Sequence, residues 1–363
     1  MQSYMKNLLL PLFFAATNLT AIASSTPPPA KPPAEQQPVY VYINPEQIPE
    51  HTWDTDLFGR NKQGFSGHAE FLYWKAMEGA MSYAFKTDSV DPVKDTAAIG
   101  QYENATYGMD PGFRLALSFF RAPHYWEVWA QYTRMTSHGS NHIAAPSGGN
   151  RYLDPVWESA PPASTNQALS AADSSLHLNY NVIDFNFDRV YQHNPHLRLR
   201  FIGGLTGAWI DQSTQIDYSC LSGDNSSVHL KWNYWGAGFR FGFMGDWYWF
   251  EDFYMTSRFT LAGFVGPYEN SSHQTSDGTV TRNTRYSDNR AVVNMQLLIG
   301  PSWQKTFGKR RIELFAGCEY NIWGNLQEVY NTSQASPTSS RGSWINKGDL
   351  SFIGLTARAT TTF

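Results

Sequence analysis

One stretch of the chain, residues 231–265, constrains the fold more than any other because its apolar residues recur at every second position. Successive side chains of a β-strand point to opposite faces, so a period of two gives a strand one apolar face and one polar face. The apolar positions are Trp235, Ala237, Phe239, Phe241 and Phe243 in the first half, and Phe253, Met255, Phe259, Leu261, Gly263 and Val265 in the second. A predicted turn at 245–246 and an aromatic cluster at 247–250 separate the halves. Two amphipathic strands with aromatic side chains at their ends are typical of a transmembrane β-barrel.

The composition of the whole chain favours the same fold class. Charged residues make up 16% and aromatic residues 15% of the 363 residues, whereas proteins in general average about 25% charged residues. Mean hydropathy is -0.43, and no run after the N-terminus reaches the roughly 18 apolar residues that a spanning helix needs. The formal charge of -4 offers no excess of Lys and Arg for binding nucleic acid. We therefore expect an all-β protein, a transmembrane antiparallel β-barrel, without a nucleic-acid partner.

The first 64 residues predict export rather than barrel structure. Lys6, an apolar run from Leu8 to Ala16 and the sequence Ala-Ile-Ala at 21–23 form the pattern of a secretory signal peptide covering residues 1–23. Residues 26–49 are rich in proline, which favours an extended polyproline conformation over a central strand. We therefore expect a signal peptide at 1–23, a Pro-rich periplasmic leader at 24–64 and the barrel at 65–363, in the bacterial outer membrane.

Alternating segments of strand length follow one another from Phe65 to the end of the chain. They lie at 65–74, 81–85, 95–107, 113–119, 125–135, 174–191, 196–216, 228–245, 249–267, 286–306, 310–330 and 349–363. Both chain ends of an outer-membrane barrel are expected in the periplasm, so the number of strands must be even. Counting the weak segment at 95–107 gives about twelve strands. Ten is the alternative, if the hairpin at 65–87 is one irregular strand.

The connections between these segments alternate in length and predict the orientation. Short connections are expected at 193–195, 245–246 and 308–310, and long polar ones at 138–173, 217–227, 268–285 and 331–348. Because barrels have short periplasmic turns and longer outer loops, the long connections should face outward. The last segment ends in Phe363 on the lipid-facing phase, which is similar to the C-terminal signal recognised by the outer-membrane assembly machinery. The expected partners are outer-membrane lipid and that machinery, and homo-oligomerisation is left open.

The polar faces of the predicted strands carry charged side chains. A charge on the lipid face near the bilayer midplane would cost ~2–4 kcal/mol, so these side chains should point into the lumen. Such a lining favours a porin for small hydrophilic solutes, and an excess of arginine favours anions. The same groups are alternatively Arg–Glu pairs that brace the wall. The predicted pore-lining residues are Arg114, Arg198, Arg200, Arg240, Arg258, Arg358, Glu70, Glu127, Glu313 and Glu319.

Other functions find less support in the sequence. No catalytic, cofactor-binding or metal-binding motif occurs, so we expect neither enzyme activity nor a cofactor or metal. A phospholipase-like barrel would need Ser and His together at the lipid boundary, and no predicted outward face has such a pair. A structural or adhesive envelope barrel with a closed lumen is the second hypothesis. Cys220 in a predicted loop and Cys318 on a lipid-facing strand are expected to be free thiols.

Three segments carry a family resemblance: GHAEFLYWKAMEGAMSYAF at 67–85, RLRFIGGLTGAWIDQ at 198–212 and NYWGAGFRFGF at 233–243. They resemble the major-outer-membrane-protein-like, pore-forming family of chlamydia-related bacteria and Legionella, over about residues 65–363. The resemblance implies an abundant outer-membrane porin. It departs from the chlamydial members in cysteine, because two cysteines cannot support a cross-linked disulfide network.

Overall fold

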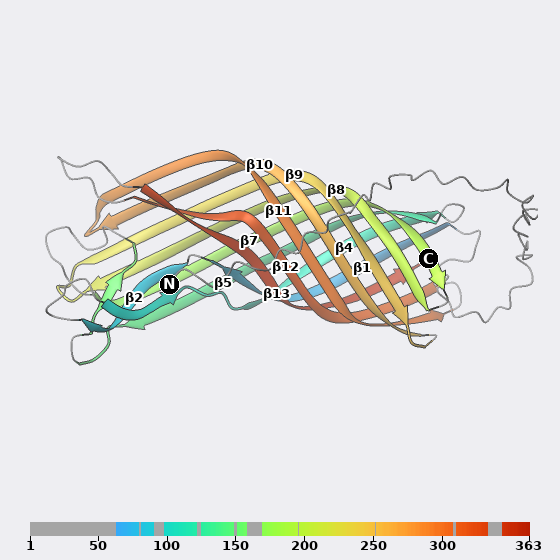
Figure 1. Ribbon diagram of the computed structural model, residues 1–363, viewed down its shortest axis with the longest axis horizontal. Coiled ribbons are helices and arrows are strands. Elements are labelled where there is room, and N and C mark those ends of the chain that lie inside the picture. The colour runs from blue at the N-terminus through green and yellow to red at the C-terminus, as the bar shows by residue number, and fades with distance from the viewer. Residues whose placement is uncertain are drawn as a thin grey trace, which may run out of the picture. The chain divides into compact units, whose positions relative to one another are not determined.

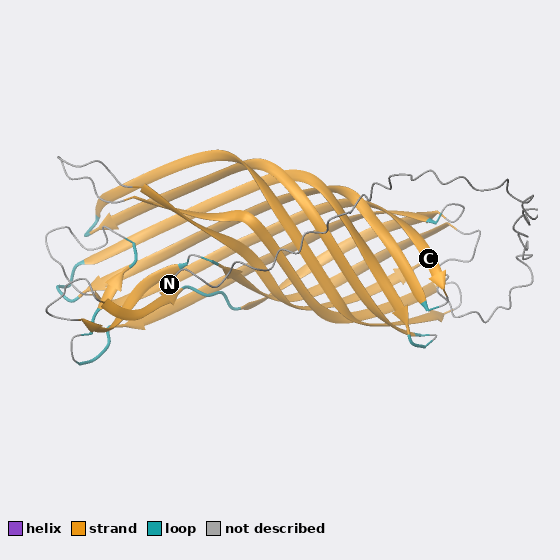
Figure 2. Cartoon of the chain, viewed as in Figure 1, coloured by secondary structure: helices purple, strands orange, loops and turns teal. Residues whose placement is uncertain are grey.

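The computed structural model describes residues 63–79, 81–90, 98–121, 125–148, 151–157, 169–194, 196–250, 252–307, 310–332 and 343–363. The predicted signal peptide and almost all of the predicted leader lie outside these residues. Within them every regular element is a β-strand, as Figure 2 shows, so the prediction of an all-β protein is confirmed. None of the described residues forms a helix long and apolar enough to cross a membrane.

Ten antiparallel strands close into a barrel (Figure 1). The first and last strands pair directly, with Glu70 opposite Arg358, and this pairing closes the ring. The order around the barrel is β1-β13-β12-β11-β10-β9-β8-β7-β5-β4. The strands are β1 (Gln63–Glu78), β4 (Met109–Arg121), β5 (Trp126–Ala144), β7 (Leu169–Asn194), β8 (Leu197–Cys220), β9 (Asn225–Tyr248), β10 (Phe253–Ser276), β11 (Thr279–Phe307), β12 (Arg310–Thr332) and β13 (Ser343–Thr362).

The count of twelve strands is corrected to ten, because two of the predicted strands leave the barrel. β2 (Ser82–Val90) and β3 (Ala98–Asn104) form a separate sheet with β6 (Leu153–Pro155), and β1 pairs with β4 instead. Alternation alone cannot separate the two cases, since strands of a small sheet have the same period of two. The alternative count of ten is therefore correct, although the hairpin at 65–87 is not one irregular strand.

The strands from β7 to β12 are much longer than a membrane requires. They have 23 to 29 residues, whereas a tilted spanning strand needs about 9–11. Two predicted loops, 217–227 and 268–285, are therefore mostly paired strand, joined by turns at 221–224 and 277–278. Asp277 has a φ of 47° and Gly278 a φ of 76°, the left-handed conformation that an Asp-Gly hairpin turn requires. Polar residues on both faces made these extensions look like loops.

The other predicted connections also change. β5 runs to Ala144 and β7 begins at Leu169, so the loop predicted at 138–173 is shorter, and β13 begins at Ser343, inside the loop predicted at 331–348. The turn predicted at 245–246 is not there, because β9 continues to Tyr248 and the chain bends at 249–250 instead. We call the end of the barrel that contains the turn at His196, the bend at 249–250 and Phe363 the periplasmic end. The end with the turns at 221–224 and 277–278 is the outer end.

An apolar band covers the outside of the barrel next to the periplasmic end. On β9 it extends from Trp247 through Phe241, which is 64% exposed, to Trp235. The twelve residue-to-residue steps from Trp235 to Trp247 correspond to about 40 Å along the strand and, at a tilt of about 45°, to about 28 Å along the barrel axis, close to the ~25 Å band of outer-membrane barrels. Beyond Trp235 the outward residues on β9 are Asn233 and Lys231. The polar extension of the strands therefore continues beyond the apolar band.

The inside of the barrel is filled by side chains in two kinds of layer. Charged and polar residues occupy the half next to the periplasmic end. The half next to the outer end contains the apolar core, much of it aromatic, together with buried polar residues that include the ion pair of Arg290 and Glu328. The small sheet of β2, β3 and β6 contributes to the apolar half through Tyr83, Ala84 and Leu153. The Tyr218 hydroxyl on β8 donates a hydrogen bond of 2.6 Å to the carbonyl of Tyr83. This contact joins the small sheet to the barrel wall near the outer end.

Position relative to the apolar band should decide how the barrel tolerates a new charge. Phe241→Arg places a guanidinium at the centre of the band and should lower the free energy of unfolding in lipid vesicles by ~2–4 kcal/mol. Ser287→Arg, on the exposed outward face of the polar extension, is the matched control and should change it by less than about 0.5 kcal/mol. Equal losses in urea-induced unfolding would mean that the band does not mark the hydrocarbon region.

Candidate functional site in the barrel lumen

All ten of the predicted pore-lining residues lie on the inner face of the barrel. Eight are buried, with Arg358 the most exposed of them at 9%, and Arg200 and Glu313 are half-buried. Strand phase therefore placed every one of them on the correct face. A charged side chain at 9% exposure or less contacts other side chains more than solvent, so the partners of each decide what the lumen can do.

Five of these residues form one cluster, which we call the central cluster: Glu70, Arg114, Arg258, Glu319 and Arg358. Arg114 is at its centre, because its guanidinium pairs with Glu70 and also donates to Glu319 at 2.8 Å. These three residues come from β1, β4 and β12, so the bridge joins strands on both sides of the barrel's closing pair. Arg258 and Arg358 are held less closely, at 3.9 Å from Glu319 and 3.7 Å from Glu70.

Neutral side chains complete the shell around these carboxylates. Glu319 accepts a hydrogen bond of 2.6 Å from the Thr356 hydroxyl and another from the amide of Gln296. Arg114 donates a further bond of 3.0 Å to Thr133, and its guanidinium lies 5.4 Å from the ring of Trp74. Charged groups inside a protein are stable only when they are paired and hydrogen-bonded. The central cluster meets that condition for Arg114 and Glu319.

The remaining predicted residues pair around the wall. The Arg240 guanidinium donates to Asp184 at 3.1 Å, and Asp184 also accepts from Gln131 and Thr206. Arg198 pairs with Asp246 at 2.8 Å and Arg200 with Glu127 at 3.2 Å.

The hydroxyl of Tyr254 donates a hydrogen bond to Glu313. The guanidinium of Arg198 also lies 5.5 Å from the ring of Tyr248. All ten predicted residues therefore have a polar partner on a neighbouring or nearby strand.

Four buried charged residues of the same layer were not predicted from the sequence: Asp184, Asp188, Asp246 and Arg311. Asp184 and Asp188 follow the inward phase of the predicted strand at 174–191, between Ile183, Phe185 and Phe187, so the signal was present. Asp246 is missing from the predicted set because the sequence predicts a turn at 245–246.

With these residues the basic and acidic side chains of the lining become equal in number. The described polar half contains seven Arg (114, 198, 200, 240, 258, 311, 358) and seven acids (Glu70, Glu127, Asp184, Asp188, Asp246, Glu313, Glu319). The excess of arginine expected from the sequence is therefore not present among the described inner residues.

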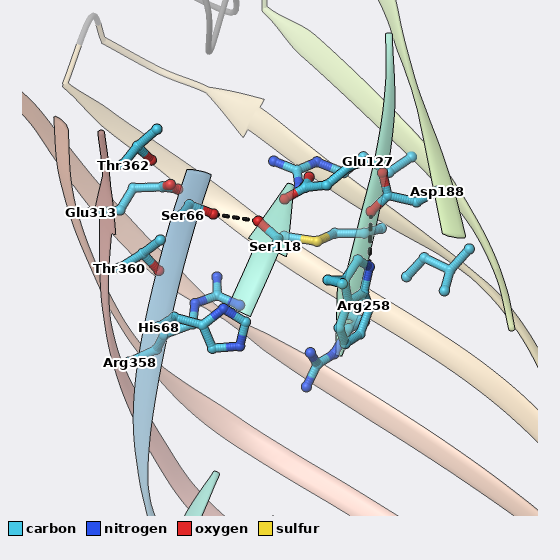
Figure 3. Close-up of a pocket in the computed structure, with 14 residues that line it drawn as sticks. Ser66, His68, Ser118, Glu127, Asp188, Arg258, Glu313, Arg358, Thr360 and Thr362 are labelled. Atoms are coloured by element: carbon cyan, nitrogen blue, oxygen red, sulfur yellow. Dashed lines mark hydrogen bonds and ion pairs between the residues drawn. The ribbon is translucent and has the colours of Figure 1, made fainter. Parts of the chain in front are cut away.

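A cavity opens within this layer near the periplasmic end, and Figure 3 shows its lining. We call it the vestibule. It has about 690 Å³ of empty space, part of it open to solvent. Its charged lining consists of Arg200, Arg258, Arg358, Glu127, Asp188 and Glu313, with His68, and its hydroxyl lining of Ser66, Ser118, Thr360 and Thr362. It therefore offers both hydrogen-bond donors and acceptors to anything that enters.

An aromatic layer lies against the central cluster on the side of the outer end. It consists of Trp74, Tyr180, Phe264, Trp323 and Phe352, which are exposed by 0–2%. Ring centroids are 4.7 Å apart between Tyr180 and Phe352, and 4.9 Å apart between Phe264 and Trp323. Gly354 makes room for Trp74, since a Cβ at this position would lie 2.8 Å from the Trp74 ring. Ring contacts of the layer link Tyr180 on β7 with Trp323 on β12 and Phe352 on β13.

The described residues contain no group of three or more His, Cys, Asp or Glu side chains arranged to hold a metal ion. Cys220 is buried, Cys318 is exposed, and both thiols are free.

The sequence of this barrel matches a known family over most of its length. The model of the family described as Legionella pneumophila major outer membrane protein precursor matches residues 59–362. The chain belongs to this family. It is accordingly a bacterial outer-membrane β-barrel, and the family resemblance of its three segments is confirmed. A comparison with curated proteins finds no match.

Solved structures resemble the chain only distantly. The outer membrane protease OmpT from Escherichia coli is 9% identical, with a TM-score of 0.46 over 86% of this chain and 99% of that one. A FadL homologue from Pseudomonas aeruginosa is 9% identical, with a TM-score of 0.23 over 83% and 90%. The toluene transporter TbuX from Ralstonia pickettii is 10% identical, with a TM-score of 0.25 over 84% and 90%.

The central cluster should contribute far more to stability than an exposed ion pair of the same chemistry. Arg114→Met leaves two buried carboxylates without their shared partner and should lower the free energy of unfolding by about 3–5 kcal/mol. Arg285→Met removes the partner of Glu269, a pair of 2.9 Å whose arginine is 71% exposed, and should cost about 0–1 kcal/mol. Urea-induced unfolding in vesicles measures both, and similar losses would contradict the assigned role of Arg114.

Proposed function

We propose that the protein is an outer-membrane pore for small hydrophilic solutes and that its resting lumen is closed. The observation that carries this proposal is a set of buried polar atoms without a hydrogen-bond partner: Nε of Arg240, Nε and Nη2 of Arg258, and both amide atoms of Asn186. Buried polar groups are normally paired with protein or water. If these side chains only stiffened the barrel wall, their polar atoms would be paired with other protein groups. In a path that admits water or solute, the same atoms can form hydrogen bonds with the water or the solute.

Two layers would have to move for a solute to pass. The first is the Arg114 bridge between Glu70 and Glu319. The second is the aromatic layer. The bridge consists of long side chains that can swing against the wall and exchange partners with water, so its opening needs no movement of the strands. The aromatic side chains are packed ring against ring, which makes their layer the higher barrier.

A permanently closed envelope barrel is the second candidate function. The observation that favours it is the same aromatic layer, because its five side chains are exposed by no more than 2% and pack ring against ring inside the barrel. In that case the ion pairs only stiffen the wall.

Conductance of the purified protein in a planar lipid bilayer separates the two functions. The pore proposal predicts brief, rare openings of the wild type and a large increase in open time for Trp323→Ala, which removes a ring between Phe264 and Tyr180. The matched control is Trp235→Ala, the same change on the lipid face, where the side chain is 54% exposed. It should leave the openings unchanged. Silent bilayers for both wild type and Trp323→Ala would establish the closed barrel.

Selectivity tests how the charges act once the pore is open. With seven basic and seven acidic residues in the described lining, the wild type should show a reversal potential near zero in a salt gradient rather than a marked anion preference. Arg240→Ser with Arg258→Ser should shift the reversal potential toward cation selectivity, because the acidic groups then outnumber the basic ones. Strong anion preference in the wild type would show that a local group of arginines, not the total charge, controls passage.

A further inference from the structure

The charges around the vestibule are balanced in total but divided between its two walls. The central cluster on β1, β4, β10, β12 and β13 contains three guanidiniums and two carboxylates, so its net charge is positive by one. The wall formed by β5, β7 and β8 contains Arg200, Glu127 and Asp188, so its net charge is negative by one. Figure 3 shows His68 and Arg358 on one side of the vestibule and Glu127 and Asp188 on the other.

The other charged groups of the layer do not share this division. Arg240 pairs with Asp184, and Arg198 pairs with Asp246. Each of these pairs has one charge of each sign. Glu313, which lines the vestibule on the side of Arg358, and Arg311, two positions before it on β12, add one further charge of each sign. The two uncompensated charges therefore face the same cavity, and neither has a counter-charge of its own within hydrogen-bond distance.

The groups that carry the uncompensated charges also have unused hydrogen-bonding atoms. Arg258 is 4% exposed, and its Nε and Nη2 have no hydrogen-bond partner. Asp188 is 2% exposed, and its Oδ1 has none, while its Oδ2 accepts from the Trp129 ring at 3.2 Å. Nε2 of His68 is likewise unpaired, 3.8 Å from Glu70. All three residues line the vestibule.

A buried net charge is costly unless an opposite charge approaches it. A single anion would satisfy only the wall of Arg258 and Arg358, and a single cation only the wall of Asp188. A molecule that carries both charges satisfies the two walls together and leaves the total charge of the lumen at zero. The hydroxyls of Ser118 and Thr360 add neutral hydrogen-bonding groups between the walls.

We propose that the vestibule binds small zwitterions of the free α-amino acid class, with the carboxylate at Arg258 and Arg358 and the ammonium group at Asp188 and Glu127. His68 supplies a further donor to the carboxylate. This site deepens the proposed pore function by naming its solute, and it rests on that function only for the passage of the solute. Binding itself requires only access from the periplasmic end.

The test uses the full chain folded in detergent and glycine as the probe. Glycine should bind saturably in isothermal titration and raise the temperature of thermal unfolding, because a ligand that binds only the folded state stabilises it. Acetate and methylammonium, which carry one charge each, should bind at least about tenfold more weakly, as loss of one charged hydrogen-bonding contact predicts. This comparison needs no mutant and therefore does not depend on the folding of any variant.

Two variants assign the ends of the ligand. Arg258→Gln should weaken glycine binding about tenfold or more and leave methylammonium binding unchanged, and Asp188→Asn should weaken glycine binding while leaving acetate binding unchanged. Arg258→Lys, which keeps the charge, should recover part of the glycine affinity. Arg285→Gln, the same kind of change on the exposed outer surface, is the control and should have no effect.

Three results would overturn the proposal. Acetate binding as tightly as glycine would define a plain anion site. Glycine binding that is unaffected by Arg258→Gln would place the ligand elsewhere. No saturable binding of glycine would mean that water satisfies both walls. Failure of conduction is a separate outcome, because a barrel that never conducts can still bind glycine, and a pore that conducts need not.

Discussion

Charged side chains inside a narrow barrel must find their partners within the wall, and the rest of this structure follows from that requirement. Ten strands leave too little room for a wide aqueous channel, so each inward guanidinium is desolvated by the side chains around it. Breaking a buried pair by removing one partner is strongly destabilising, whereas a complete pair is close to neutral. Arg114 therefore requires carboxylates on the strands around it, and Glu70 and Glu319 supply them.

The layering of the lumen combines two different ways of closing it. Ion pairs close a passage with groups that water can also hydrate, while packed rings close it by excluding water altogether. Both layers meet at Trp74, which lies against the Arg114 guanidinium on one side and against the Phe352 ring, 5.8 Å away, on the other. A change in the conformation of the Trp74 side chain would therefore alter the packing of both layers.

Much of the fold was predictable because a period of two is a direct physical signature of a strand with one face in lipid. The phase of that pattern also placed the ten lining residues on the inner face. What the pattern could not supply was the destination of β2 and β3, since a strand in a small sheet alternates as a barrel strand does. It also failed beyond the membrane, where Glu269 and Ser271 on β10 face water and the contrast between the faces disappears. Pairing partners such as Arg114 and Glu319 were out of reach because they depend on which strands lie across the lumen, and strand phase does not contain that information.

The Arg114 bridge also has a consequence for the order in which the barrel can assemble. Arg114 and Glu319 are 205 positions apart. Glu70, which pairs with Arg114, lies on the first strand of the barrel, and Thr356, which donates a hydrogen bond to Glu319, lies on the last. Glu70 and Arg114 are opposite each other on the paired strands β1 and β4, and Thr356 and Glu319 lie on the paired strands β13 and β12. Arg114 and Glu319, in contrast, meet only when β1 pairs with β13. The growing sheet therefore gains nothing from the Arg114–Glu319 pair until the ring closes, and a barrel that lacks its last strand has an open seam and leaves this pair unformed.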